Sequence, residues 1–278
     1  MPSISVTNPE SISAIALGSS TPKLGGVVNI SKFSSLGIVN ASNQDLTGFQ
    51  GVDKITALTS VNTANNKIVG DLQDFSSNSN CAIIDVGNNN YNGSMTAPLP
   101  TGIQVFRADY NNFAKVDNYI PDFSTLTSLA VYNIGRQSDS FGISINTDTG
   151  GDATLNWSGP GELTNTSVDA GSIEGAIPES IRMISLGRTN ISKDSKRILL
   201  TQLYDTFNGK PTNWAKTTAV NGVTYPSPTI GVFNDRGIHG SPATSTGPWH
   251  NLLGKHSAVT INAAKAKLVD VGFALYGY

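Results

Sequence analysis

A short apolar pattern returns every 22 or 23 residues between residues 36 and 126, and this spacing constrains the fold more than any other feature of the sequence. In four of these five copies two apolar residues stand two positions apart, as Val39 does with Ala41 and Ile84 with Val86, and the second copy has Val61 with Thr63. Side chains two positions apart point to the same side of a β-strand. A repeat of this length therefore predicts stacked units, each holding one short strand whose apolar pair faces a shared core.

The copies start at residues 36, 58, 81, 103 and 126, then less regularly near 152 and at 181. An Asn stands at a fixed position after the strand in three of them, at Asn66, Asn89 and Asn111. Such a side chain can satisfy backbone groups at a buried bend, where they would otherwise lack partners. The regularity is broken by Gln44 and Ile134 at this position, and by a sixth copy with few matching residues.

Written as L-x-x-L-x-L-x-x-N-x-L, the pattern resembles the leucine-rich repeat family. The segment from Ile173 to Ile181 is similar to the L-x-G-x-I-P-x-x-L signature of the plant-type subclass. The resemblance implies a β-rich α/β solenoid, a leucine-rich-repeat horseshoe with short parallel strands on its concave face. The opposite side would be irregular or hold a second short strand rather than a helix. The alternative is an ordinary all-β protein whose Asn and Gly richness produces accidental matches.

The pattern changes after Ser192. Apolar residues at helical spacing predict a helix over 193–207, and strong helix formers predict another over 262–271, followed by a short strand over 273–276. Residues 210–257 are rich in Pro, Gly, Ser and Thr and are expected to be loop-like. Residues 264–275 resemble the C-terminal module that follows repeat arrays in phage-encoded and bacterial surface repeat proteins. Three parts are expected: an N-terminal cap or assembly tether (1–30), a solenoid of about seven repeats (31–192) and a small α+β cap (193–278).

Composition excludes several classes of function. Only 14% of the residues are charged and the net charge is -2, so the basic surface that nucleic-acid binding requires is missing. Neutral polar residues take the place of charge, with 27 Asn and 28 Gly. Cys81 is the single cysteine, which excludes an intrachain disulfide and a cysteine metal site. We expect no membrane insertion and no signal peptide, because no apolar run reaches the required length.

The sequence offers little catalytic chemistry. His239, His250 and His256 lie near Asp235 without a metal-ligand spacing, and solvated or hydrogen-bonded surface residues explain them better. Asp169, Glu174 and Glu179 are the most plausible group of carboxylates for glycoside hydrolysis, but two of them occupy variable positions of the repeat. We therefore predict a protein that is not an enzyme, with no catalytic residues, no metal site and no cofactor.

The residues between the core positions of each strand form the concave surface, where a solenoid binds its ligands. Small polar groups with central aromatic and Arg side chains suit a carbohydrate or a protein loop. The alternative is a surface that is merely wetted. A second candidate surface is the aromatic set Trp214, Tyr225, Phe233 and Trp249 in the C-terminal loops, which could equally be staples of a cap. The predicted ligand-binding residues are Asn62, Asp85, Arg107, Asp109, Tyr110, Tyr132 and Arg188.

The composition and the two resemblances suggest a tailed-phage virion protein, assembled in the host cytoplasm. The first hypothesis is a tail-fibre or tail-associated adhesin that recognises a host surface glycan or protein. The alternative is an architectural component of baseplate, neck or capsid decoration that binds other virion proteins. A bacterial surface repeat adhesin is a third possibility. A homo-oligomer is possible in each case.

Overall fold

The computed structural model describes residues 7–18, 20–93, 95, 98–113, 123–135, 177–186, 193–231 and 261–276. The chain divides into two units. We call Met1–Val116 with Asn133–Ala153 the N-terminal unit, and Asp117–Tyr132 with Thr154–Tyr278 the C-terminal unit.

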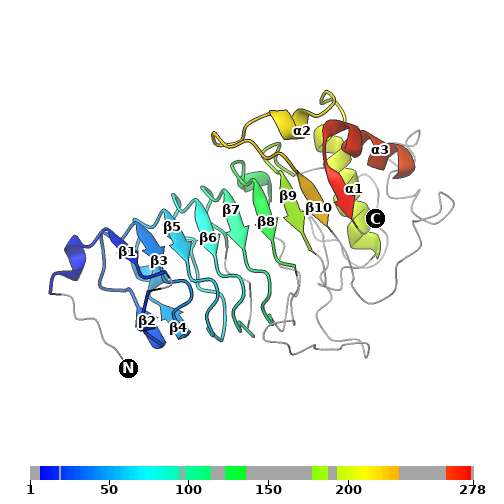
Figure 1. The fold of residues 1–278 in the computed structure, drawn as a ribbon. Helices are drawn as coiled ribbons and strands as arrows, with labels where there is room; N and C mark the ends of the chain where they lie inside the picture. Colours follow the sequence, from blue (N-terminus) through cyan, green and yellow to red (C-terminus); the bar gives the residue numbers. More distant parts are fainter. Residues whose placement is uncertain are drawn as a thin grey trace, which may run out of the picture. The chain divides into compact units, whose positions relative to one another are not determined.

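The main feature is one sheet of nine strands in the order β1-β3-β5-β6-β7-β8-β9-β10-β11. Every neighbouring pair whose register is defined is parallel (Figure 1). Strands β3, β5, β6 and β7 begin at residues 38, 60, 83 and 105, so the predicted short parallel strands at repeat spacing are confirmed. This arrangement is compatible with a repeat solenoid. The strands are β1 (Ala14–Ala16), β3 (Ile38–Asn40), β5 (Ser60–Asn62), β6 (Ile83–Asp85), β7 (Val105–Arg107), β8 (Val131–Asn133), β9 (Met183–Ser185), β10 (Thr229–Gly231) and β11 (Ala274–Tyr276).

The core of the N-terminal unit lies on one side of these strands. The middle residue of each strand points inward, and Val39, Val61 and Ile84 are at most 1% exposed. The apolar residue three positions before each of them is equally buried, as Leu36 and Leu58 show. β-branched residues suit such short strands, because their stiff side chains pack well on a pleated surface. The apolar pattern of the sequence is therefore the core of this unit.

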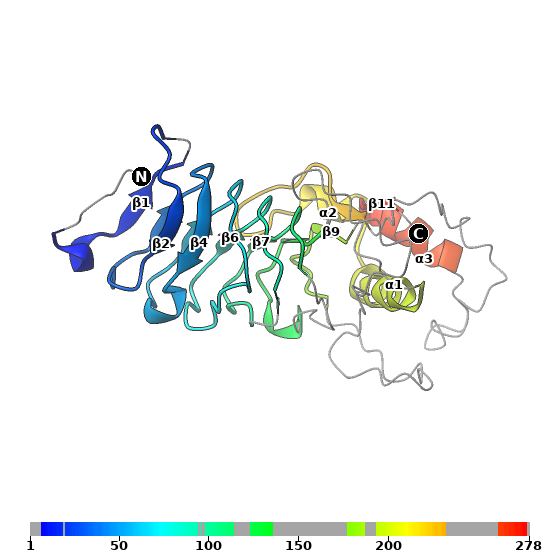
Figure 2. The same cartoon turned by 90° about the horizontal axis from the view of Figure 1, so that it is seen from below.

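The return side of the N-terminal unit carries a second sheet of two parallel strands, β2 (Gly26–Asn29) and β4 (Leu46–Gln50). Figure 2 shows these strands beside the layers of the main sheet. Short 3-10 turns occur at η1 (Pro9–Ser11), η2 (Val52–Lys54) and, in the C-terminal unit, η3 (Phe123–Thr125). Apart from these single 3-10 turns, the described residues between 7 and 135 form strands and irregular chain, with no α-helix.

The register predicted for the fifth repeat is wrong. Leu126 was expected to be the first core residue of that repeat. Leu129 holds this first position instead, and Tyr132 is the buried middle residue of the strand. Hydrogen bonds settle the register, because the Ala108 N–H donates to the Asn133 carbonyl as the Ala41 N–H does to Asn62. The step from the fourth repeat is thus 26 residues, from 103 to 129. Ile134 is therefore a buried core residue of the fifth repeat. It does not stand at the position that Asn66, Asn89 and Asn111 hold in the earlier repeats.

Strand β9 follows β8 directly in the sheet, because the N–H groups of Arg182 and Met183 both donate to the Ala130 carbonyl. The sheet therefore passes from the fifth predicted repeat to the seventh, whose core residues Ile181, Ile184 and Leu186 are buried as expected. The residues predicted to form the sixth repeat lie outside the described part of the chain.

The C-terminal unit contains both predicted helices and the predicted last strand. They are α1 (Lys193–Phe207), α3 (Ile261–Val271), which packs on α1, and β11. Two further elements, α2 (Trp214–Thr217) and β10, lie in the segment that was expected to be loop-like. Strand β10 is stabilised by parallel pairing on both sides, with β9 and β11, rather than by its own composition. The predicted part boundaries at residues 30 and 192 remain predictions.

Candidate functional site

The outward face of the strands in the N-terminal unit carries two rows of side chains. Each strand offers its first and last residue to this face, because the middle residue points into the core. Direct Cα pairing brings equivalent residues of successive strands side by side. The polar row is Asn40, Asn62, Asp85, Arg107 and Asn133. The apolar row is Ile38, Ile83 and Val105, with Ser60 at the equivalent position of β5.

The polar row also shapes the chain. The Oδ1 atoms of Asn62 and Asp85 accept the backbone N–H two residues later, at 3.0 and 3.1 Å. Asn40 and Asn133 make the same bond at 3.3 and 3.2 Å. Such turns end each strand with a local side-chain partner. They leave the Nδ2 amino groups of Asn40 and Asn62 as potential donors, whereas the Asn133 side chain hydrogen-bonds to the Asp109 carboxylate.

The charged members of this face lie together over β6 and β7. Arg107 Nη1 is 3.8 Å from Asp85 Oδ2, and the Arg107 side chain is 48% exposed. Asp109 stands beside them, and the Oδ1 atoms of both carboxylates flank Gly87. Burial raises the pKa of Asp109, and the nearby charge of Asp85 adds to this, while Arg107 acts in the opposite direction. The cluster thus offers carboxylate acceptors and a guanidinium donor within one small area.

Tyr110 borders this cluster in an unusual backbone conformation. Its φ is 54°, and the equivalent residues of the three preceding repeats, Asn43, Asn65 and Asn88, have φ between 51° and 58°. Asn tolerates this left-handed region, whereas a bulky side chain is strained there. Among these four equivalent residues, the aromatic one therefore lies next to the charged cluster.

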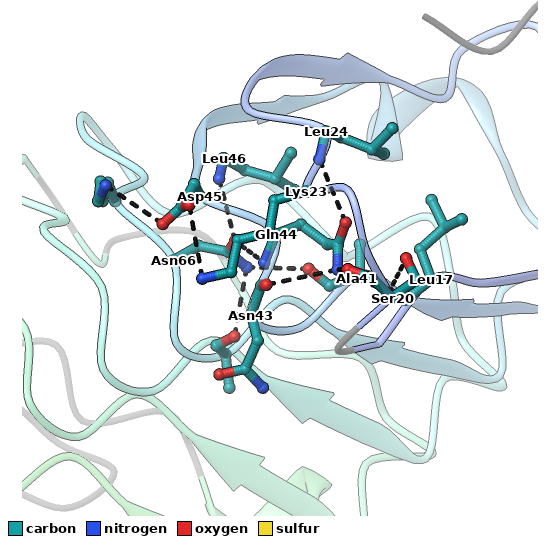
Figure 3. A network of polar contacts seen from close by, with 12 residues as sticks. Leu17, Ser20, Lys23, Leu24, Ala41, Asn43, Gln44, Asp45, Leu46 and Asn66 are labelled. Carbon is teal, nitrogen blue, oxygen red and sulfur yellow. Dashed lines mark hydrogen bonds and ion pairs between the residues drawn. The ribbon is translucent and has the colours of Figure 1, made fainter. Parts of the chain in front are cut away.

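A ladder of buried amides holds the bends behind this face (Figure 3). Asn66 Oδ1 accepts the N–H groups of Gln44 and Leu46 at 2.8 and 3.0 Å. Its Nδ2 donates to the Ala41 and Thr63 carbonyls, both at 2.9 Å. The predicted role of the Asn column in satisfying backbone groups is confirmed at Asn66, Asn89 and Asn111.

Gln44 replaces Asn in the ladder without interrupting it. Its Nε2 donates to the Leu17 carbonyl at 2.7 Å, and its Oε1 accepts the Leu24 N–H at 3.3 Å (Figure 3). These bonds match those that Asn66 makes to Ala41 and Leu46, one repeat later. The longer side chain therefore reaches the same groups, and the ladder begins one repeat earlier than the sequence pattern indicated.

Four predicted ligand-binding residues, Asp85, Arg107, Asp109 and Tyr110, lie together, and Asn62 is the Cα partner of Asp85. Tyr132 is a correction: it is fully buried with its ring 5.2 Å from that of Phe123, because the fifth repeat is shifted in register. Arg188 lies outside the described residues. The apolar row was not predicted from the sequence, although Ile38, Ile83 and Val105 recur at the repeat spacing.

The C-terminal unit contains a buried cation that the sequence analysis did not single out. Arg182 is fully buried, its Nη1 donates to the Glu179 and Ile181 carbonyls at 2.7 Å, and its guanidinium lies 4.5 Å from the Trp214 ring centre. Burial lowers its pKa. Trp214 also packs against Phe207. Its ring therefore stabilises this unit by contacts within it, rather than standing free as a recognition residue.

The remaining candidates give no assembled site in the described part of the chain. Glu179 forms an ion pair with Lys210 at 2.7 Å, and Tyr225 is half-buried. His239, His250, His256, Asp169, Glu174, Phe233 and Trp249 lie outside the described residues. Among the described residues no three metal-ligating side chains gather, and no helix there is long and apolar enough to cross a membrane.

No family model matches the chain. No curated protein matches it either.

Proposed function

We propose that this chain is a non-enzymatic recognition protein, a leucine-rich-repeat solenoid that binds its ligand with the outward strand face of the N-terminal unit. The observation that carries the proposal is the gathering of Asp85, Arg107, Asp109 and Tyr110 over β6 and β7. Asn40 and Asn62 stand at the position of Asp85 and Arg107, and the three preceding repeats have Asn at the position of Tyr110 and Ser42, Ala64 or Gly87 at that of Asp109. Arg and Tyr together are enriched where binding energy is concentrated.

A host surface glycan is the ligand that this cluster suits best. Sugar hydroxyls both donate and accept, and they need carboxylates, amides and a guanidinium at close range. The polar row supplies the Nδ2 donor of Asn62 beside Asp85, and Asn133 holds the Asp109 carboxylate in place by a side-chain hydrogen bond. Tyr110 offers the apolar surface on which a sugar ring can rest. With Tyr132 buried, the platform is one ring rather than two.

The proposed setting is a tailed-phage virion, with the chain as a tail-fibre or tail-associated adhesin. Support comes from the resemblance of residues 264–275 to the module that follows repeat arrays in phage-encoded proteins. The composition, rich in Asn and Gly and poor in charge, is a second support. Both supports are independent of the strand-face cluster.

The test is a glycan array with purified protein, together with binding to whole host cells. The double variant Arg107→Ala with Tyr110→Ala should lose at least about tenfold in affinity, since two anchoring side chains are removed. Lys54→Ala with Tyr276→Ala removes an exposed cation and an exposed Tyr elsewhere, and should bind as the wild type does. Folded wild-type protein that binds neither glycans nor cells would contradict the proposal.

A second candidate function is docking to another virion protein, and the apolar row favours it. Ile38 and Ile83 are 49% and 40% exposed on the same face. Exposed aliphatic side chains in a row are typical of protein contacts. Ser60 holds the equivalent position in β5, so Ile38→Ser with Ile83→Ser should fold normally. If glycan binding is absent and this variant no longer enters assembled particles, the architectural function is supported.

A further inference from the structure

The first layer of the N-terminal unit, residues 12–29 with β1 and β2, is less covered than the layers behind it. Ile12, Ile15 and Leu17 occupy core positions and are only half-buried. Their equivalents in the next layer are Leu36, Val39 and Ala41, each at most 1% exposed. The second sheet has the same gradient, because Val28 is half-buried while its Cα partner Phe49 is 3% exposed. Apolar surface therefore remains open at this end.

Within the described part of the chain, both sheets also end here in a free edge. Strand β1 is the first strand of the main sheet, and β2 pairs there with β4 alone in the second sheet (Figures 1 and 2). On its paired side, the Leu17 N–H donates to Asn40 and the Ser13 carbonyl accepts from Gly37. Because backbone groups alternate along a strand, those of Ala14 and Ala16 face away from β3. Such an edge is a template for another strand.

The amide ladder does not continue beyond this layer. Each ladder residue donates to the carbonyl of the preceding layer, as Gln44 does to Leu17 and Asn66 to Ala41. Ser20 holds the equivalent position in the first layer. Its Oγ donates to Leu17 of its own layer at 2.9 Å and is too short to reach outward. This end is therefore not built to receive another repeat of the same kind.

We propose that the first layer binds the first layer of a second copy of this chain. A two-fold axis perpendicular to both sheets would set β1 antiparallel to the same strand of the second copy. The same axis would pair β2 with its own equivalent, because both strands lie at this end. One symmetry operation thus satisfies both free edges and joins the half-buried side chains of the two copies into one apolar layer.

The charges and the small side chains at this end favour a second copy of the chain as the partner. Glu10 is exposed just before β1, and Lys23 lies beyond the other end of that strand, where its 48% exposed side chain forms an ion pair with Asp45 at 3.4 Å. Because the two-fold axis reverses the strand, Glu10 of each copy approaches Lys23 of the other. The side chains of Ala14 and Ala16 are small, so they leave the two backbones free to approach. Self-complementarity of this kind is what a symmetric dimer requires.

The experiment measures the mass of the full chain in solution by light scattering after size exclusion, and by sedimentation equilibrium. Wild-type protein should be dimeric at about 100 µM, a concentration at which even micromolar affinity fills the interface. Ala16→Pro removes an outward N–H without touching the bonds to β3. Val27→Asp places two like charges next to the two-fold axis on the 57% exposed Val27 of β2. Each variant should weaken the dimer by about tenfold or more.

The matched control is Val69→Asp, because Val69 is 50% exposed in the same unit but lies outside the first layer. It should leave the dimer unchanged. Circular dichroism verifies the fold of each variant, and the exposed position of Val27 makes Val27→Asp decisive if Ala16→Pro does not fold. Monomeric wild-type protein would overturn the proposal, as would a dimer unaffected by Val27→Asp or equally weakened by Val69→Asp. Glycan binding plays no part in this readout, so failure here is distinct from failure of the strand-face function.

Discussion

At the scale of single residues, one buried amide holds each bend of the N-terminal unit, and Asn89 tests its contribution. Its Nδ2 donates to the Thr63 and Val86 carbonyls at 2.9 and 3.1 Å, and its Oδ1 accepts the Ile68 N–H. Asn89→Ala should lower the free energy of unfolding by about 1–3 kcal/mol, because buried backbone groups lose their partners. Urea denaturation measures the loss.

The control for the ladder is Asn90→Ala, since Asn90 is the next residue and is half-buried. A surface substitution of this kind should change the free energy of unfolding by no more than about 0.5 kcal/mol. A cost at Asn89 as small as the cost at Asn90 would contradict the ladder.

Tyr110 carries a conformational cost that its neighbours avoid. Its φ of 54° lies in the region where three equivalent residues are Asn. Tyr110→Asn should therefore raise the free energy of unfolding by about 0.5–1 kcal/mol while removing the ring from the strand face. Tyr110→Ala keeps the β-carbon strain and should not be stabilising. If the Asn variant is the less stable protein in thermal unfolding, contacts of the ring outweigh the strain.

At the scale of elements, the turn that follows β4 depends on Gly51. Its φ is 90°, and a β-carbon there would lie 2.5 Å from the Ser31 nitrogen. Gly70 has a similar φ of 95° but nothing within 4 Å of its β-carbon position. Gly70→Ala should cost about 1 kcal/mol from backbone strain alone, and Gly51→Ala clearly more, because the chain must also move. Equal midpoints in urea would show that Ser31 does not restrict this turn.

The elements that could be predicted from the sequence are those with a local signal. Helices α1 and α3 have apolar spacing and helix formers, and strands β3, β5, β6 and β7 have the repeated spacing of core residues. Strands β1 and β10 lack such a signal, because pairing with neighbours distant in sequence defines them. The predicted register of the fifth repeat was wrong for a related reason. Leu126 and Leu129 both fit its first position, and only the hydrogen bond from Ala108 to Asn133 distinguishes them.

At the scale of the whole molecule, the candidate site could be predicted in part. The repeat spacing placed Asp85, Arg107, Asp109 and Tyr110 on one face, because residues at the same position of successive strands become neighbours. It could not place Tyr132, which depended on the register of one repeat. The same spacing also contains the apolar row, but an exposed Ile and a buried Ile are identical in a sequence pattern. Burial of individual side chains is decided by the packing of the layers.

The fold is expected to depend little on ionic strength, because neutral amides and apolar packing dominate it. The ion pairs in the described part of the chain join side chains that are partly or largely exposed, as in Lys54 with Asp53 and Lys67 with Asp45. Exposed pairs of this kind contribute little and are screened by salt. Raising NaCl from about 0.02 to about 0.5 M should change the free energy of unfolding by less than about 1 kcal/mol.

Urea denaturation at the two salt concentrations measures this change. The cost of Asn89→Ala serves as the internal reference, because a buried amide bonded to backbone groups is not screened and should cost the same at both concentrations. A salt-induced loss larger than the cost of Asn89→Ala would mean that charge, rather than the amide ladder, holds the layers together. A fold held by its amides loses stability when an Asn is removed and keeps it when salt is added.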